Sequence, residues 1–465
     1  MKQCEYSGLH YICPGNGGWG MVRIAMMIPE SYELFISPAA CGRHGSLGAI
    51  RHGIKDRLSY YFVDEKDIIA GYDQMIVRAA GQLLERLAGH GIHPRAVILF
   101  VTCMDDLIGT DHEAVAEELE ALHADTYFLF AHMNPITDNR PSPPMVSIHK
   151  SVFGLLGRLY QEKQDCGLNC IGNLEGIRPE CEFFPLAEML GFEKVRHIGS
   201  CQSFEQFEEM AGSVCNAVLN VTAEAAAQQL EKTCHQTVVR MYYSYLPEKI
   251  REGYLRLAKA AEQRLGKKIP EEFYRMLDER EAHLKDIAVR VREQLGGRPI
   301  ALDDFACTAP FELAEFLLSQ GFQVKYIGYR EAGDAGRVEH LIERYPQVQI
   351  LCLMEDTIPV IREMESGHSP DQGNKVFDAD AGSTAEGKVS VCRPDESSLA
   401  GVPEDLICIG VDIAYVLKAT YVENLFSDQG NYGYYGLEKM LEGLLNAAAR
   451  KADLKKMIED HGLVV

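Results

Sequence analysis

Several features that define other protein classes are missing from this chain of 465 residues. It has no apolar run near the ~18 residues needed to cross a bilayer, and its N-terminus, MKQCEYSGLHYICPGNGG, has no charged-then-apolar leader. We therefore expect a cytoplasmic protein. Basic residues are outnumbered, with 46 Lys and Arg against 68 Asp and Glu and a formal net charge of −22. This balance argues against nucleic acid or an anionic membrane as a partner, because both bind basic surfaces.

Phosphate-binding motifs are scarce where a nucleotide site would need them. Two of the predicted α/β units start strand–turn–helix without a GxGxxG, and the sequence contains no Walker A pattern, so we predict no nucleotide site on this chain. The 14 cysteines are spread over the whole length, which does not suggest a disulfide scaffold in a reducing compartment. Most of them are expected to be small buried apolar residues, as in the apolar stretches around Cys215, Cys352 and Cys408.

Alternation of short apolar runs with helical periodicity predicts the fold class. Continuous apolar runs such as 95–102 are typical of strands that are covered on both faces of a parallel sheet. The alternation occurs three times, which predicts an α/β protein with three Rossmann-like doubly wound domains and mostly parallel sheets. Further strands are expected near 126–130, 168–173, 194–198, 298–303, 323–327, 349–353 and 405–410. Helices are expected over 67–90, from 111, and over 147–163, 181–190, most of 203–233, 247–296, 309–320, 336–345 and 436–462.

Composition also suggests domain boundaries. Residues 134–146, NPITDNRPSPPMV, form a proline-rich connector. We predict an N-terminal α/β domain over 1–145, a second α/β domain with a long helical segment over 146–296, a third Rossmann-like domain over 297–430, and a C-terminal helical region over 431–465.

Three cysteines in the first quarter of the chain lie in compact Gly- and Pro-containing contexts. They are Cys13 in YICPGNGG, Cys41 in SPAACGRHG and Cys103 in VTCMDDLIGTD. Their separations, 13 to 41 and 41 to 103, are far too wide for a local zinc knuckle. They fit ligands gathered from separate loops at the carboxyl ends of strands, where open α/β sheets place their sites.

Residue chemistry alone leaves the role of these cysteines open. Three thiolates are one ligand short of a cuboidal iron–sulfur cluster, so a fourth ligand would come from another residue or from a second chain. Three buried structural cysteines, or a zinc site on the same thiolates, remain as alternatives.

The sequence around the cysteines resembles that of the component 1 proteins of the nitrogenase superfamily. This superfamily includes the nitrogenase α and β subunits, a cofactor-assembly scaffold, dark-operative protochlorophyllide and chlorophyllide reductases, and nickel-tetrapyrrole reductases. The resemblance continues through Gly172-Asn-Leu-Glu175 and reaches the glycine- and tyrosine-rich stretch Gly430-Asn-Tyr-Gly433-Tyr-Tyr-Gly436. It implies three Rossmann-like domains per subunit, in agreement with the alternation of strands and helices.

The resemblance also implies a cofactor and partners. Cys13, Cys41 and Cys103 would hold an iron–sulfur cluster, of the 4Fe-4S or eight-iron P-cluster type, at an interface with a related subunit in a homodimer, heterodimer or heterotetramer. An ATP-dependent partner like the nitrogenase iron protein would supply electrons. The two further ligands of the molybdenum–iron cofactor fall near Thr222 and Glu423, which are unsuitable replacements, so we predict no such cofactor.

The expected function is therefore that of a nitrogenase-like reductase component acting on an unidentified substrate. The alternative is a non-catalytic β-like partner subunit or a cofactor-assembly scaffold of the same superfamily. A structural α/β protein without iron is the third possibility. The sequence does not name a catalytic residue.

Overall fold

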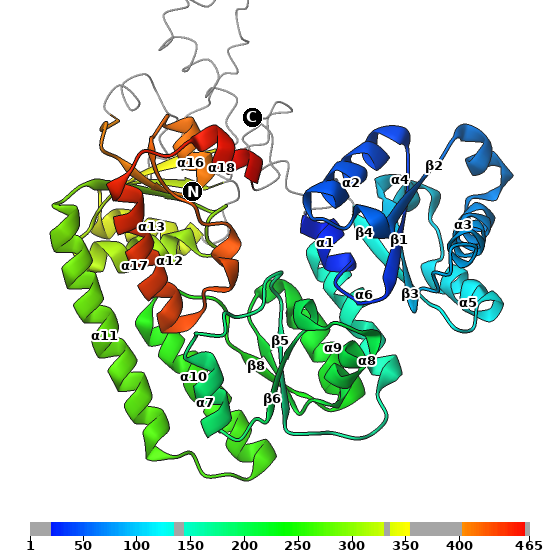
Figure 1. Cartoon of the computed structure of the whole chain (residues 1–465), viewed down its shortest axis with the longest axis horizontal. Coiled ribbons are helices and arrows are strands. Elements are labelled where there is room, and N and C mark those ends of the chain that lie inside the picture. The colour runs from blue at the N-terminus through cyan, green and yellow to red at the C-terminus, as the bar shows by residue number, and fades with distance from the viewer. Residues whose placement is uncertain (1–19, 134–143, 330–334, 354–401, 461–465) are drawn as a thin grey trace, which may run out of the picture. The chain divides into compact units, whose positions relative to one another are not determined.

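The computed structural model describes residues 20–133, 144–329, 335–353 and 402–460. These residues form helices around three separate sheets (Figure 1). Among these residues, every pair of neighbouring strands in the three sheets is parallel. The predicted α/β class with three Rossmann-like parallel sheets is thus confirmed.

The first sheet has the strand order β2-β1-β3-β4. Its side chains alternate between two faces, because successive residues of a strand point to opposite sides. Leu34 and Ile36 of β1 join the core under α3 and α5, whereas Phe35 joins the core with α1 and α6. The strands are β1 (Ser31–Ser37), β2 (Leu58–Phe62), β3 (Ala96–Thr102) and β4 (Tyr127–Met133). The helices are α1 (Gly20–Ala25), α2 (Ala39–Arg51), α3 (Glu65–Ala88), α4 (Cys103–Ile108), α5 (His112–Leu122) and α6 (Pro144–Leu159).

The second sheet repeats this topology in the order β6-β5-β7-β8. Helix α6 lies against both β4 and α9, and its apolar residues belong to one core that reaches Ile171 of β5 and Val218 of β7. One continuous core therefore joins the first two sheets. The strands are β5 (Gly167–Ile171), β6 (Lys194–His197), β7 (Cys215–Val218) and β8 (Thr237–Arg240). The helices are α7 (Phe183–Met189), α8 (Phe204–Glu209), α9 (Glu224–Cys234) and α10 (Pro247–Leu265), with a 3₁₀ turn at Val221–Ala223.

The third sheet has the order β11-β10-β9-β12-β13. Successive strands are added first on one side of β9 and then, from β12, on its other side, while all of them stay parallel. Helix α12 covers β9 and β10, and α17 packs against β12 and β13. The strands are β9 (Pro299–Asp303), β10 (Gln323–Tyr329), β11 (Gln349–Cys352), β12 (Ile407–Ile409) and β13 (Tyr421–Glu423). The helices are α11 (Glu271–Leu295), α12 (Pro310–Ser319), α13 (Ala335–Arg344), α16 (Val411–Val416), α17 (Gly433–Ala449) and α18 (Leu454–Asp460), with a turn at Ser427–Gly430.

The chain divides into two compact units. One consists of Gly18–Tyr243 with Arg251–Leu277 and contains the first two sheets. The other contains the third sheet and is built mainly from Ser244–Ile250 and Asp278–Val465. Among the residues with described structure, no helix is long and apolar enough to span a membrane.

Two local features were not predicted from the sequence. The stretch 203–233 is largely helical, as expected, but strand β7 also lies within it, between α8 and α9. No helix is predicted before residue 67, yet the 13-residue helix α2 begins at Ala39. Both omissions have the same cause, because pairing and packing with distant elements override weak local propensity.

A pair of charged side chains joins α5 to α6 and gives a pH-dependent prediction. Arg158 donates to both oxygens of Glu120 at 2.9 and 2.7 Å, and the Phe128 N–H donates to Glu120 at 3.1 Å. Burial raises the pKa of Glu120, but these hydrogen bonds outweigh burial and hold the pKa below its ordinary value of 4.5. The folded chain thus gains stability above pH ~4.5 and loses it as the pH falls through the lower folded value.

We expect Glu120→Gln to lower the free energy of unfolding at pH 7 by about 0.5–1 kcal/mol, because the pair is partly exposed. Urea denaturation at pH 7 and at pH 3 checks this, and the deficit should shrink at the lower pH. The control is Glu117→Gln on the same helix, where the side chain is exposed. An equal loss in both variants at both pH values would contradict the assignment.

Candidate functional site

Cys41 lies in the first turn of helix α2, which follows β1 after a single residue, Pro38. Cys103 is the first residue of α4 and directly follows β3. Both thiols are partly exposed. Because β1 and β3 are paired, with Ile36 opposite Val101, the two cysteines come from the carboxyl ends of neighbouring strands.

This position is the switch point of the first sheet, where the order in which strands are added reverses. From β1 the chain moves outward to β2, and it then crosses to β3 and β4 on the other side. Open α/β sheets bind ligands in the crevice at such a switch point, outside the carboxyl ends of the strands. Burial and the neighbouring Cys103 both raise the pKa of Cys41. The Cys41 thiol is therefore harder to deprotonate than a free cysteine unless a cation is bound beside it.

Two glycines on α2 determine how closely the helix that carries Cys41 packs on the sheet. A Cβ on Gly42 would lie 2.9 Å from the Phe62 ring, and one on Gly45 would lie 2.6 Å from the Phe35 ring. Both glycines therefore allow α2 to pack closely on β1 and β2. Within the described structure no side chain caps the first turn of α2, so its N–H groups remain available to an anionic group.

Cys13, the third predicted ligand, lies outside the described residues. Among the residues that the structure does describe, no group of three or more His, Cys, Asp or Glu side chains is arranged to hold a metal ion. The donor set at the switch point is thus two thiols beside uncapped helix N–H groups. Two soft sulfur donors fit part of an iron–sulfur cluster's ligand set, which is made of cysteine thiolates.

Acidic and histidine residues next to Cys103 form a group that the sequence did not single out. Asp105 is buried and pairs with the Nε2 of His112. His132 Nε2 lies 3.4 Å from Asp106 Oδ2, and the His112 and His132 rings are 5.9 Å apart. Burial, together with the Asp105 carboxylate, raises the pKa of Tyr72. In the sequence, the adjacent Asp105 and Asp106 after Cys103 were the only sign of this group. Their partners come from α3, α5 and β4, which no sequence pattern links to the aspartates.

Exposed apolar side chains are concentrated on the elements that carry or flank the two cysteines. Of the fourteen large apolar side chains exposed in the described part of the chain, seven lie on α2, β2, α3 and α4. They are Leu47, Ile50, Tyr60, Phe62, Ile68, Ile69 and Leu107. Single exposed apolar residues are normal, but this concentration beside one site is typical of a surface that contacts another protein.

Comparison with known protein families decides the classification. A family model described as Nitrogenase component 1 type Oxidoreductase matches residues 17–368. The chain belongs to this family. Cys41 and Cys103 lie inside the matched range, and Cys13 precedes it. The resemblance predicted from the sequence is thus confirmed, and the chain is assigned to the component 1 type oxidoreductases.

Solved structures support the same fold. The structure described as "Nitrogenase Cp1 at pH 6.5" aligns with a TM-score of 0.64 at 14% identity, over 96% of this chain and 94% of that chain. The structure described as "Nitrogenase Cp1 at pH 5" aligns with a TM-score of 0.55 at 15% identity, over 94% and 88%. A search of curated protein sequences finds no match.

The glycine- and tyrosine-rich stretch 430–436, part of the component 1 resemblance, has a structural role. Gly430 and Gly433 have φ values of 77° and 65°, which glycine adopts readily. A Cβ on Gly436 would lie 2.7 Å from the Asn431 carbonyl oxygen. Tyr434 is fully buried and donates to Glu281 at 2.7 Å.

The structure describes the surroundings of Thr222 and Glu423, the two positions that the sequence comparison placed near the molybdenum–iron cofactor ligands. The Thr222 N–H and hydroxyl lie 3.0 and 2.9 Å from the Asn220 side-chain oxygen, so this threonine is part of the turn before α9. Glu423 is the last residue of β13.

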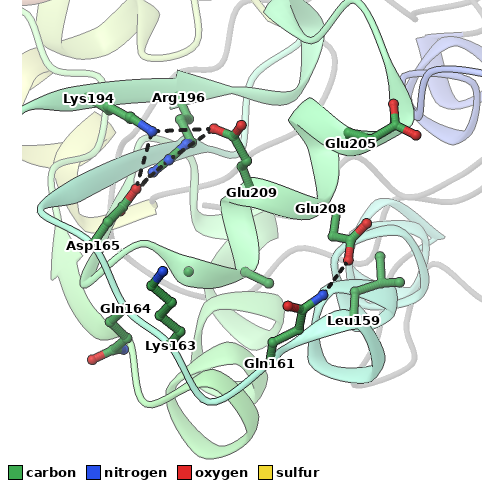
Figure 2. Close-up of a pocket in the computed structure, with 12 residues that line it drawn as sticks. Leu159, Gln161, Lys163, Gln164, Asp165, Lys194, Arg196, Glu205, Glu208 and Glu209 are labelled. Carbon is green, nitrogen blue, oxygen red and sulfur yellow. Dashed lines mark hydrogen bonds and ion pairs between the residues drawn. The ribbon is translucent and has the colours of Figure 1, made fainter.

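A large hollow elsewhere in the family fold carries no comparable chemistry. A hollow of about 480 Å³ lies beside Asp165, Lys194 and Arg196 (Figure 2). Arg196 donates to Asp165 at 3.0 Å, and Lys194 lies 3.6 Å from Glu209, as the dashed lines in Figure 2 show. Asp165 precedes β5 and Lys194 begins β6, so this hollow is at the amino ends of the strands. Asp165, Lys194, Arg196 and Glu209 pair with one another, and we assign the hollow no ligand.

Proposed function

We propose that this chain is the cluster-bearing component of a nitrogenase-like reductase. In this proposal Cys13, Cys41 and Cys103 are ligands of an iron–sulfur cluster, which receives electrons from a separate ATP-hydrolysing iron protein. The electrons then reduce a substrate, without a molybdenum–iron cofactor. One observation carries the proposal: Cys41 and Cys103 come from the ends of adjacent strands β1 and β3, at the switch point of the first sheet.

The cluster is proposed to lie at an interface between two subunits. Three cysteines leave a four-iron cluster one protein ligand short, so a related component 1 subunit or a second copy would complete it. The exposed apolar side chains on α2, β2, α3 and α4 support this arrangement, because association would bury them. Contact with a partner would also exclude water from the sulfur atoms.

Each element of the chain has a defined part in this scheme. A bound cluster supplies one-electron chemistry, and the cysteines hold it through thiolates. The uncapped N–H groups at the start of α2 stabilise negative charge beside Cys41 and thereby tune the reduction potential. Asp105 lies on the Cys103 helix, and its hydrogen bond to His112 of α5 fixes the surroundings of Cys103.

The decisive experiment is anaerobic purification followed by iron and sulfide analysis and EPR of the reduced protein. We expect iron and acid-labile sulfide in equal amounts, with a mass above that of one chain. Iron-free anaerobic protein, or a monomer with a full cluster, would refute the interfacial site.

A second measurement separates the proposed reductase from its alternatives. Reduction of the cluster by a nitrogenase-type iron protein with ATP would support the electron-transfer role. Release of the intact cluster to an acceptor protein, without such reduction, would favour the assembly scaffold instead.

A further inference from the structure

A small cavity lies at the carboxyl end of the third sheet, where β13 ends and helix α17 begins. About 20 Å³ of space, which is room for one water-sized group, is lined by residues that include Tyr245, Glu423, Asp428, Asn431 and Lys439. This volume is below the range of about 300–1,000 Å³ that is usual for drug-sized ligands. The cavity therefore suits a ligand, or part of a ligand, with very few atoms.

The Tyr245 hydroxyl is the first group that indicates a bound ligand in this cavity. The side chain is only 5% exposed, and its buried oxygen has no hydrogen-bond partner among the residues with described structure. Leaving a buried polar group unpaired costs about 1–3 kcal/mol, so native structures almost always provide a partner. A bound molecule in the cavity would supply one.

Glu423 brings a carboxyl to the same cavity. Burial raises the pKa of its carboxyl to about 7. Helix α17 makes room for this carboxyl at Gly443, since a Cβ there would lie only 1.9 Å from Glu423 Oε1. A glycine inside a helix costs about 1 kcal/mol relative to alanine, so the fold accommodates this acidic side chain at an energetic cost.

Asp428 supplies a second buried carboxyl to the same cavity. One of its oxygens accepts the Thr308 N–H at 3.1 Å, and burial raises the pKa of the carboxyl to about 8. It is held by an unusual turn in which Ser427, Asp428 and Gln429 all have φ between 46° and 61°. Left-handed backbone costs about 1–2 kcal/mol for each non-glycine residue. Such strain persists where the surrounding structure enforces a functional geometry.

The one cationic side chain among the lining residues is already paired. Lys439 Nζ lies 2.7 Å from Glu442 Oε2, and its side chain is 43% exposed. Its charge is thus matched at the surface. The remaining chemistry of the cavity is two buried carboxyls, an unpaired hydroxyl and the side chain of Asn431.

The geometry points to a binding site for a small ammonium group. In this site the ammonium N–H groups donate hydrogen bonds to Tyr245, Glu423 and Asp428. The group is either the free ammonium ion or the primary ammonium head of a small amine. The Tyr245 hydroxyl lacks a partner and two carboxyls line the same space, so a compact cation with several N–H groups suits all three. This inference uses residues of the third-sheet unit only, so it stands or falls separately from the cluster proposal.

The test is isothermal titration calorimetry of the full chain at fixed ionic strength with ammonium, methylammonium, potassium and tetramethylammonium chlorides. Potassium matches ammonium in charge and approximate size but has no N–H donors. We expect ammonium or methylammonium to bind at least tenfold more tightly than potassium or tetramethylammonium. Tighter binding of ammonium identifies the free ion, and tighter binding of methylammonium identifies an amine head. Equal binding of all four ions, or no binding, would overturn the proposal.

Two variants and a control locate the site. Tyr245→Phe and Glu423→Gln should each weaken ammonium binding at least tenfold, whereas Glu404→Gln, an exposed acid of the same unit, should leave it unchanged. Tyr245→Phe removes an unpaired hydroxyl, so its thermal midpoint in potassium buffer should equal or exceed that of the parent. Unchanged ammonium affinity in both folded variants would place the binding elsewhere and refute the assignment.

Discussion

Replacing Cys103 by alanine is expected to remove most of the iron from anaerobically purified protein, and Cys41→Ala should do the same. Each thiol comes from one of the two strands that flank the switch point of the first sheet, so neither can substitute for the other. Losing a ligand from a cluster that already draws on a partner leaves the iron atoms open to solvent and exchange. We expect the iron content to fall at least fivefold, measured colorimetrically and by the reduced EPR signal.

Cys166→Ala is the matched control for this experiment. Cys166 is also partly exposed, but it lies before β5 at the amino end of the second sheet. Its replacement should leave iron and EPR intensity at the parent level. If Cys41→Ala or Cys103→Ala kept the parent's iron content, the ligand assignment would be wrong. Circular dichroism of the variants distinguishes cluster loss from unfolding, because the helices and sheets should remain.

The sequence was sufficient to predict the fold class because apolar runs buried on both faces are a strong local signal. The run 95–102 became strand β3, which is fully buried, and the three-fold alternation became three parallel sheets. Strand β7 was missed because Cys215–Val218 is only four residues long and lies between helices. Its strand conformation comes from pairing with β5 and β8, which are remote in the sequence.

The candidate sites show a similar limit. The cysteines could be placed at strand ends from the sequence, but the adjacency of β1 and β3 depends on a crossover through β2 and α3. The cavity at Tyr245 was not predicted at all. Its residues are separated by nearly 180 positions, from 245 to 423, and no motif joins them. Buried unpaired groups become visible only when packing is known.

The switch point of the third sheet gives the second large prediction, a loss of stability on Gly410→Ala. Gly410 follows β12 with φ of 112°, and a Cβ there would lie 2.1 Å from Asp303 Oδ1. Asp303 ends β9 and links the segments that follow β9 and β12. Its carboxyl accepts hydrogen bonds from the N–H groups of Ala306 at 2.9 Å and Ile413 at 2.8 Å. Alanine would add backbone strain and displace this buried carboxyl. We expect a loss of at least about 3 kcal/mol in the free energy of unfolding.

The control for Gly410→Ala separates strain from contact. Gly297, in the same unit, also has positive φ, 82°, but a Cβ there would meet nothing within 4 Å. Gly297→Ala should therefore cost only about 1 kcal/mol, from backbone strain alone. Urea denaturation followed by circular dichroism compares the two midpoints. Equal losses would show that Asp303 does not require the space beside Gly410. A much larger loss at Gly410 would establish that the carboxyl ends of β9 and β12 are joined through this one buried side chain.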